Sequence, residues 1–374
     1  MNSASIILRP GTKTLTTIRL CCAAAAILLS LCEPARAADW RHRIESRHFA
    51  KTAPGQWTSP TIKTRFAYDE LIYSWHPAKP GDSFRLYLKA VFGPQDESEW
   101  LYAGFWGSVT DGVTNRPLPA FDRGVIDMDW LKLTTNASAF QFKVISAGRL
   151  RRPPSITVVA STKAPAAVET ASNTKSTPGR VLDVPLRRQM NSAGERLRDR
   201  CQSAALASAM EYYGKSVPLE DIVRHTHDPE YNYPGLWPRV IAAAREFGFD
   251  GYIERFRDWP SVKRTLAENK MILCSMRLKE GAAKAPPYAS MGNHIVVLCG
   301  VTDDGRVVVT DSALGKSGEG YLCQWLQDDF ETVWMRTKGG VAMVICPPKG
   351  APRRVVKNLP PFPINRTFPP GDDH

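Results

Sequence analysis

The sequence predicts two domains, an all-β sandwich followed by an α+β domain, and two patterns carry this prediction. The first is the alternation of apolar and polar residues in segments such as "SFRLYLKAVF" (83–92), which is typical of a half-buried strand. The second begins after residue 180, where helical segments come first and apolar strands follow. Helices and strands that are grouped in this way along the chain indicate an α+β arrangement.

Residues 1–37 are predicted to be a secretory signal peptide. Basic residues precede the apolar run "LCCAAAAILLSL" (20–31), and "ARA" (35–37) is a small-residue cleavage site before Ala38. The apolar run is too short for a comfortable membrane span, and no second run of 18 or more apolar residues follows. We therefore expect an exported protein, periplasmic or secreted, with no transmembrane helix after signal removal. A lipoprotein anchored at Cys32 and a retained N-terminal anchor are the alternatives.

Residues 38–160 form the predicted sandwich. The segments "VIDMDW" (125–130) and "AFQFKV" (139–144) repeat the strand alternation, and clusters of Gly, Pro and Asp separate the strands. Six of the ten tryptophans lie in this part of the chain. Most are expected in the core, but exposed aromatic rings could stack on sugars, so contact with an envelope glycan or protein is a candidate role.

Residues 161–180 are predicted to be a flexible linker, because they are rich in Ala, Ser, Thr and Pro and have no apolar period. We expect this linker to couple the domains weakly, so that residues 181–347 would fold alone. The tail, residues 348–374, is proline-rich and expected to be extended. Between 181 and 347, helices are expected at 201–213, 236–248 and 259–270, and strands at 271–278, 294–301, 306–311 and 341–347.

The formal net charge of +12 raises the question of a nucleic-acid or envelope-surface partner. The basic residues are scattered in short runs, for example "RHRIESR" (41–47) and "GRLRRP" (148–153), and no zinc-finger or ribonucleoprotein motif accompanies them. We therefore interpret them as solvated surface charge and expect no nucleic-acid partner, while affinity for anionic envelope polymers stays open.

Five cysteines remain after the signal peptide, and an odd number in an oxidising compartment points to a reactive thiol. Cys274, Cys299 and Cys346 lie in apolar runs, where cysteine acts as a small buried hydrophobe. Whether these three and Cys323 form disulfides is left open. Cys201 differs, because it stands at the start of a predicted helix among polar residues. A helix N-terminus and a nearby imidazolium both stabilise a thiolate.

His294 is the best candidate for that imidazole, because it opens the apolar strand "HIVVLCGV" (294–301). The next strand ends at Asp311. A hairpin centred between Thr302 and Asp303 would place His294 and Asp311 directly opposite each other, with Cβ atoms roughly 5 Å apart. A turn centred further along the chain would move them out of register. The order Cys, His, Asp then predicts a nucleophile, a base and a residue that orients the base.

Two further polar features have weaker support from the residues alone. The amide of Gln189 could stabilise an oxyanion, although a surface loop is the simpler interpretation of its position. His225 and His227 form an H-x-H pair in a segment expected to be a flexible surface loop, and no third metal ligand stands at a recognisable spacing. We expect no metal and no cofactor.

Residues 181–347 resemble the bacterial papain-like cysteine peptidases of family thirty-nine, typified by the peptidases that process bacteriocins and cleave double-glycine leaders. The resemblance rests on "VPLRRQ", "CQSAALASAMEYYG", "NHIVVLCGVTDDG" and "VVVTDSA". It implies a papain-like α+β fold and hydrolysis of a peptide or protein substrate through a covalent thioacyl-enzyme. It also implies Cys201 as nucleophile, His294 as base, Asp311 as its orienter and Gln189 as the oxyanion-hole amide.

The preceding domain resembles the β domain of stand-alone secreted members, in "YSWHPAKPGDSFRLYLKA", "EWLYAGFW" and "VIDMDWLKL". The chain departs from the family pattern at Gln202, where glycine is usual, and at Ser312, where proline is usual. Neither change removes a catalytic atom. The alternatives to a peptidase are another thiol acyl transfer, amidase-like or transglutaminase-like, and a non-catalytic protein that binds an envelope glycan or protein.

Overall fold

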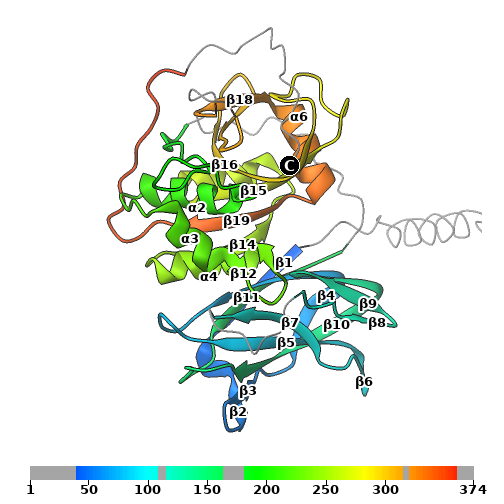
Figure 1. The fold of residues 1–374 in the computed structure, drawn as a ribbon. Coiled ribbons are helices and arrows are strands. Elements are labelled where there is room, and N and C mark those ends of the chain that lie inside the picture. The colour runs from blue at the N-terminus through cyan, green and yellow to red at the C-terminus, as the bar shows by residue number, and fades with distance from the viewer. Residues whose placement is uncertain (1–38, 108–114, 163–180, 315–319, 360–374) are drawn as a thin grey trace, which may run out of the picture.

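The structure is a computed structural model that describes residues 39–107, 115–162, 181–314 and 320–359. The predicted signal peptide, most of the predicted linker and the end of the tail lie outside these residues. We call the described residues before 163 the β domain and those after 180 the α+β domain; the two stack on each other (Figure 1). None of the helices in the described residues has the length and apolar character needed to span a membrane.

The β domain consists of strands and one short 3-10 helix, η1 (Ser46–His48). In β5 the alternation predicted from the sequence is seen directly, since Phe84, Leu86 and Leu88 are buried and the residues between them are half-buried. The strands are β1 (Asp39–Ile44), β2 (Ala50–Ala53), β3 (Gln56–Thr58), β4 (Ile62–His76), β5 (Phe84–Gly93), β6 (Asp96–Glu97), β7 (Leu101–Trp106), β8 (Ala120–Phe121), β9 (Gly124–Asp127), β10 (Trp130–Ser146) and β11 (Ser155–Ser161).

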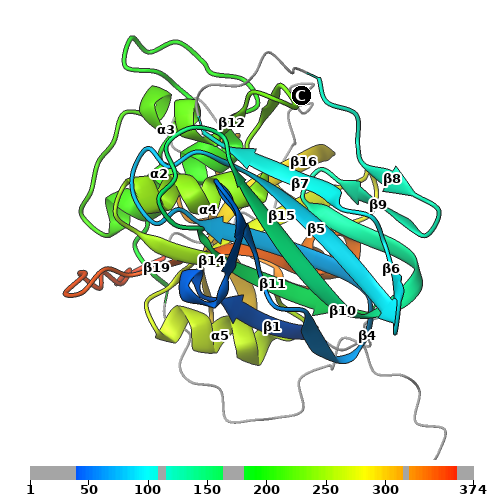
Figure 2. The same ribbon diagram turned by 90° about the horizontal axis from the view of Figure 1, so that it is seen from below.

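These strands belong to one 11-stranded antiparallel sheet within the described residues, and not to two separate sheets. The long strand β10 pairs with β4, β9, β5 and β3 at different points along its length. Its register against β4 shifts between Lys132 and Ala137, and such irregularities bend a strand. The sheet therefore folds over its own apolar face (Figure 2). The predicted sandwich is right in its strands and antiparallel pairing but not in its separation into two sheets.

The α+β domain contains a six-stranded antiparallel sheet in the order β14-β19-β15-β16-β17-β18. The predicted helices and strands are all present, with ends shifted by up to three residues. The elements are α2 (Cys201–Tyr212), α3 (Leu219–Thr226), β12 (His227–Asp228), β13 (Tyr233–Pro234), α4 (Trp237–Glu246), β14 (Asp250–Arg255), α5 (Trp259–Ala267), β15 (Met271–Leu278), β16 (Met291–Val301), β17 (Arg306–Thr310), β18 (Cys323–Leu326), α6 (Gln327–Glu331), the π-helix η2 (Thr332–Arg336) and β19 (Val341–Cys346).

Helix α2 packs against β16, the strand that carries His294. Its alanines are buried, and these small side chains let the helix lie close to the sheet. The helix ends where Gly214 adopts a φ of +94°, a left-handed conformation that favours glycine. The N–H of Lys215 then bonds to the Met210 carbonyl at 2.9 Å, which closes the last turn. The C-terminal end of α2 is thus closed, and Cys201 lies at the opposite end of the helix.

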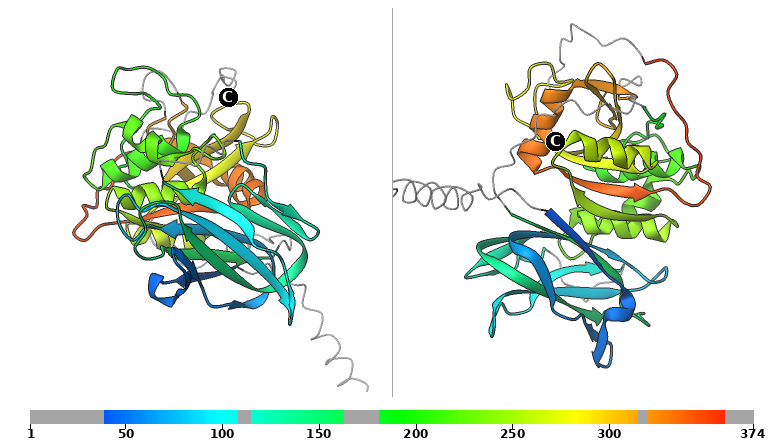
Figure 3. Two further views of the ribbon diagram at one scale, coloured as in Figure 1. Left: turned by 60° about the horizontal axis from the view of Figure 1, so that its bottom comes forward. Right: turned by 180° about the vertical axis from the view of Figure 1, so that it is seen from behind.

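The two domains share a buried interface, which contradicts the weak coupling expected from the linker composition. One continuous apolar core contains residues of both domains. A second cluster joins Tyr102 and Phe105 of β7 to Tyr231 and Leu236 of the α+β domain. Figure 3 shows the α+β domain seated along the bent sheet in two further views.

Buried charged side chains also form hydrogen bonds and ion pairs across this interface. Arg255 donates to Glu70 at 2.9 Å, and both side chains are buried. Glu230, which is fully buried, accepts from Arg85 of β5 at 3.0 Å. Arg239 is 2% exposed and donates to a main-chain carbonyl of β7 at 2.8 Å. Because a buried charge without its partner destabilises a fold by several kcal/mol, these pairs hold the domains in one arrangement.

The segment with the H-x-H pair is not a flexible surface loop. His225 lies in the last turn of α3, and its ring stacks on Trp106 of the β domain at a centroid distance of 6.5 Å. It also meets Phe247 edge-on at 5.3 Å. Burial and neighbouring arginines lower the pKa of His225, so this ring packs as a neutral aromatic at the interface.

Candidate active site

Cys201 is the first residue of α2, and its side chain is half-buried. The first four N–H groups of a helix have no partner within the helix, and no side chain caps them in α2. The helix N-terminus therefore places N–H groups and partial positive charge beside the sulfur. This is the position that the sequence predicts for a reactive thiol.

His294 and Asp311 are joined by a hydrogen bond of 2.7 Å between Nε2 and Oδ1, and both side chains are buried. The hairpin register predicted for this pair is wrong, because the turn lies further along the chain and Val297 pairs with Thr310. By that register Val296 stands opposite Asp311, and His294 lies two residues away on the same face. Diagonal neighbours at this spacing are within reach of long side chains, so His294 and Asp311 are in contact in the observed register as well.

Asp311 is fully buried and accepts more than the bond from His294. Oδ1 also accepts from the N–H of Ala313 at 2.9 Å, and Oδ2 accepts from the hydroxyl of Tyr288 at 3.2 Å. Burial alone would raise the pKa of Asp311, but the charge of His294 and these hydrogen bonds together lower it. Asp311 is therefore a carboxylate at neutral pH. No sequence pattern marks Tyr288, which lies in the loop before β16.

The ring of His294 is held as an imidazolium. Burial alone would lower the pKa of His294, but the charge and hydrogen bond of Asp311, together with the interaction with Cys201, raise it to about 10. Because Nε2 is bonded to Asp311, Nδ1 is the ring nitrogen left for the sulfur. The site thus combines a protonated imidazole, a carboxylate behind it and a thiol at a helix N-terminus.

Gln189 is buried beside the nucleophile and not in a surface loop. Its Oε1 accepts from the N–H of Arg200, the residue before Cys201, at 2.8 Å. Its Nε2 donates to Ser312 Oγ at 3.3 Å. The first bond fixes which end of the amide is the carbonyl, and an amide NH₂ has a second proton to donate. Ser312, one of the two departures from the family pattern, is thus a direct partner of this amide.

Gln202, the other departure, lies over the sulfur. Its Oε1 accepts from Cys201 Sγ at 3.3 Å, and its Nε2 donates to the carbonyl of Asp199 at 3.3 Å. The side chain is buried against Gly235, which has a φ of +68°. Any side chain at Gly235 would collide with Gln202, so the two residues fit together only with glycine there.

The β domain lines the cleft that contains Cys201 and His294. This cleft has a volume of about 180 Å³, and its wall includes the turn between β9 and β10, with Met128, Asp129 and Trp130. Asp129 accepts from the N–H of Trp237 at 2.7 Å across the interface. The Trp130 ring lies 6.1 Å from that of Trp237.

The sequence does not indicate this wall, because the alternation in "VIDMDW" (125–130) predicts one unbroken strand. In the structure Met128 and Asp129 form a turn between β9 and β10, and Met128 has a φ of +62°. Nothing in the residues of the β domain indicates that this turn meets a thiol in the other domain. Only the packing of the two domains brings the turn to the cleft.

None of the five cysteines in the described residues forms a disulfide. Cys274 and Cys299 are fully buried, and burial raises the pKa of Cys299 to about 12 and that of Cys274 well above its ordinary value. Burial also raises the pKa of Cys346. These thiols are poor nucleophiles at neutral pH.

Residues 181–342 match the model of the Peptidase_C39 like family. No curated protein and no solved structure matches the chain. The match contains Cys201, His294 and Asp311 and ends within β19, while the β domain lies outside it. The α+β domain is therefore similar to the Peptidase_C39 like family, and this similarity supports a cysteine peptidase.

Proposed function

We propose that this chain is an exported cysteine peptidase that hydrolyses peptide bonds in a peptide or protein substrate. The observation that carries the proposal is the buried His294–Asp311 pair, bonded at 2.7 Å, in the cleft that also contains Cys201. A nucleophile, a base and an orienting carboxylate in this order are the requirements of thiol acyl transfer. The match of residues 181–342 to a peptidase family favours the peptide bond as the substrate.

In the proposed reaction Cys201 Sγ attacks the carbonyl carbon of the peptide bond, and an electron pair moves onto the carbonyl oxygen. The second amide proton of Gln189 and the N–H of Cys201 donate to that oxygen. The protonated His294 gives its proton to the peptide nitrogen as the C–N bond breaks, and the amine leaves. Water, deprotonated by the now neutral His294, then attacks the thioacyl carbon. The C–S bond breaks, the carboxylic acid leaves, and Cys201 Sγ is restored beside a protonated His294.

Labelling and turnover measured together test these roles. Iodoacetamide at about pH 6 should alkylate Cys201 far faster than a model thiol, since a stabilised thiolate reacts where an ordinary thiol does not. His294→Ala should slow the labelling and abolish peptide cleavage. Gln189→Ala should leave the labelling almost intact but lower kcat/KM. The expected loss of transition-state stabilisation is about 3 kcal/mol, the usual effect of one oxyanion donor.

Mapping of the labelled peptides by mass spectrometry gives the result. Cys274 and Cys299, which are fully buried, serve as internal controls that should stay unlabelled until the protein is denatured. If Cys201 labels no faster than these two, or is found in a disulfide, the chain is a binding protein and not a peptidase. If the products with an added amine are amides formed without chain cleavage, the thiol chemistry holds but the peptidase assignment does not.

Export is the second part of the proposal, and the signal-like residues 1–37 support it. Intact-mass measurement of the protein from the envelope or medium of the host should give a chain that begins at Ala38. A species that retains Cys32, heavier by lipid chains, would contradict a protein released from the membrane.

A further inference from the structure

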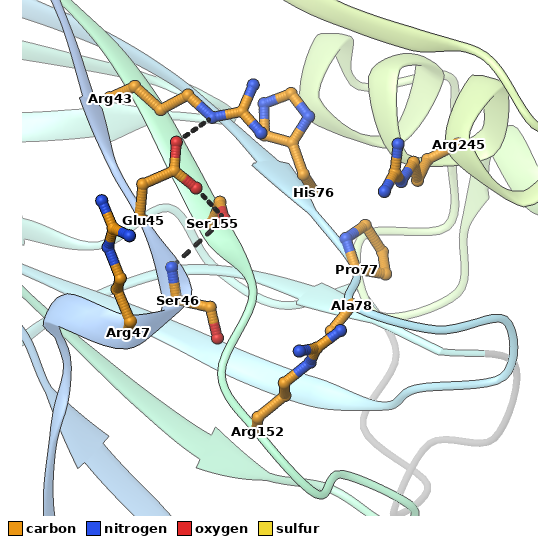
Figure 4. A pocket seen from close by; sticks show the side chains of 10 residues that line it. All are labelled: Arg43, Glu45, Ser46, Arg47, His76, Pro77, Ala78, Arg152, Ser155 and Arg245. Atoms are coloured by element: carbon orange, nitrogen blue, oxygen red, sulfur yellow. Dashed lines mark hydrogen bonds and ion pairs between the residues drawn. The ribbon is translucent and has the colours of Figure 1, made fainter.

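A second cavity lies at the junction of the two domains, and four arginines line it (Figure 4). Its volume is about 400 Å³, and neither Cys201 nor His294 lines it. Arg43 lies in β1 and Arg47 in η1, while Arg152 precedes β11 and Arg245 lies in the last turn of α4. Arginines from the separate runs "RHRIESR" and "GRLRRP" are thus brought together, so the charge that is scattered along the sequence is concentrated here.

Three of these arginines have no acidic partner among the residues that the structure describes. Arg43 is paired with Glu45 at 3.0 Å and lies 3.6 Å from Asp250. Within the described residues no carboxylate forms an ion pair with Arg47, Arg152 or Arg245, the three guanidinium groups drawn unpaired in Figure 4. Like charges that face one hollow repel each other, and an anion between them removes that repulsion.

The wall of the cavity is fixed by hydrogen bonds that do not involve the three guanidinium groups, of which Arg47 makes one long contact, from Nε to His48 Nε2 at 3.5 Å. The N–H of Ser46 donates to Ser155 Oγ at 3.2 Å, and Ser155 Oγ donates to Glu45 at 3.1 Å. Ser46 Oγ donates to the carbonyl of Pro153, the residue after Arg152. These bonds join η1, with Arg47, to the start of β11. The two segments that supply Arg47 and Arg152 are therefore held together before any ligand arrives.

His76 also lines the cavity but adds no charge to it. The side chain is buried, with Nε2 3.2 Å from Thr157 Oγ1 and Nδ1 3.2 Å from Asp250. Burial, partly opposed by Asp250, lowers the pKa of His76, so the ring is neutral. The positive charge of the cavity therefore comes from arginines, whose planar forks bind phosphate oxygens in pairs.

We propose that this cavity binds a small anion that carries two or more phosphate groups. Three guanidinium groups without an ion pair in the described residues match the charge of a di- or triphosphate, and about 400 Å³ is within the range of small-molecule sites. Arg47 and Arg152 belong to the β domain and Arg245 to the α+β domain, so one ligand contacts both. Its binding stabilises the folded chain with the domains in contact.

Calorimetric titration of the mature chain with tripolyphosphate, at about 150 mM salt to screen unspecific attraction, tests the proposal. We expect saturable binding of one ligand per chain and a higher melting temperature with the ligand. The triple variant Arg47→Gln, Arg152→Gln, Arg245→Gln should bind at least about tenfold more weakly. The matched control Lys51→Gln, Lys63→Gln, Arg65→Gln removes the same charge from exposed residues of the β domain outside the cavity and should bind as the parent does.

Three results would overturn the proposal. They are absence of saturable binding to the parent chain at this salt concentration, equal loss of binding in the triple variant and the control, and equal or tighter binding of citrate, which carries carboxylates only. If the triple variant is unfolded by circular dichroism, the single change Arg152→Lys replaces it, and loss of binding with the charge retained supports recognition by the arginine fork. Vesicles with phosphatidic acid distinguish the source of the phosphate groups. A parent chain that binds tripolyphosphate and not the vesicles has a site for a free anion, as proposed, and a chain that binds only the vesicles overturns the proposal.

Discussion

Gln202 is the residue at which this chain most directly modifies the chemistry of its thiol. Its Nε2 is held by the Asp199 carbonyl, so that Oε1 faces the sulfur at 3.3 Å. A carbonyl oxygen at this place accepts from an S–H group and repels a thiolate. The helix N-terminus and the imidazolium of His294 both attract negative charge on the sulfur, so Gln202 opposes them.

Removal of this oxygen should therefore speed the reaction of the thiol. We expect Gln202→Ala to raise the rate of alkylation of Cys201 at about pH 6 several-fold, and Gln202→Glu, which adds a negative charge, to lower it. The rates are measured with iodoacetamide under pseudo-first-order conditions. A slower reaction of Gln202→Ala than of the parent would show that Gln202 assists the thiolate.

The buried pair His294–Asp311 makes stability depend on pH in a defined direction. Since the pKa of His294 is raised to about 10, its contribution is fully present below its ordinary pKa of about 6.5 and is lost as the pH rises towards 10. Since the pKa of Asp311 is lowered, its contribution is present above about pH 4 and is lost at lower pH. Urea unfolding should therefore show the largest stability difference between the parent and His294→Ala at about pH 5–6. A difference that is constant up to pH 10 would show that the imidazolium is not part of the pair.

At the scale of elements, the turn between β9 and β10 gives the β domain a direct part in the cleft. The Trp130 ring lies near that of Trp237, and the guanidinium of Arg255 has its Cζ 5.2 Å from the Trp130 ring centroid. If the cleft binds a substrate as proposed, this wall is in position to contact it, and we expect the β domain to influence substrate choice.

Trp130→Ala should lower kcat/KM for a peptide substrate by about tenfold, or ~1.4 kcal/mol, while the alkylation of Cys201 by the small iodoacetamide stays within about twofold. Trp100→Ala is the matched control, because Trp100 is a half-buried tryptophan of the β domain outside the cleft. Equal losses in both variants would indicate a general effect on folding and not a contact with substrate.

The elements differ in how far the sequence predicts them. Helix α2 and strands β15 and β19 are predicted almost to the residue, because their apolar patterns and the glycine after α2 are local signals. The contact of His294 with Asp311 is predicted as a pair, although the register is wrong, because alternation fixes the face of a strand more firmly than its partner. The Asp129–Trp237 bond is beyond prediction, since neither residue carries a local signal for the other.

At the scale of the whole molecule, the interface changes what is expected of the isolated α+β domain. Residues 181–347 alone would expose Leu236, Tyr231 and the buried face of Arg239 to water. Loss of a buried pair costs about 3 kcal/mol, and each kcal/mol lowers the melting temperature by about 2–4 °C in a domain of this size. We expect the fragment to melt at least about 5 °C below the mature chain, measured by circular dichroism. An unchanged melting temperature of the fragment would show that the interface does not stabilise the α+β domain and that the two domains fold independently.

The buried charge pairs between the domains have a consequence for the peptide that connects them. Arg255–Glu70 and Arg85–Glu230 are contacts of the kind that hold separate subunits together, and they do not depend on an unbroken main chain. A specific protease site placed within residues 163–180 and cut after folding should yield two polypeptides that still elute together and still cleave substrate. The protein would then behave as a heterodimer whose two subunits are made as one chain.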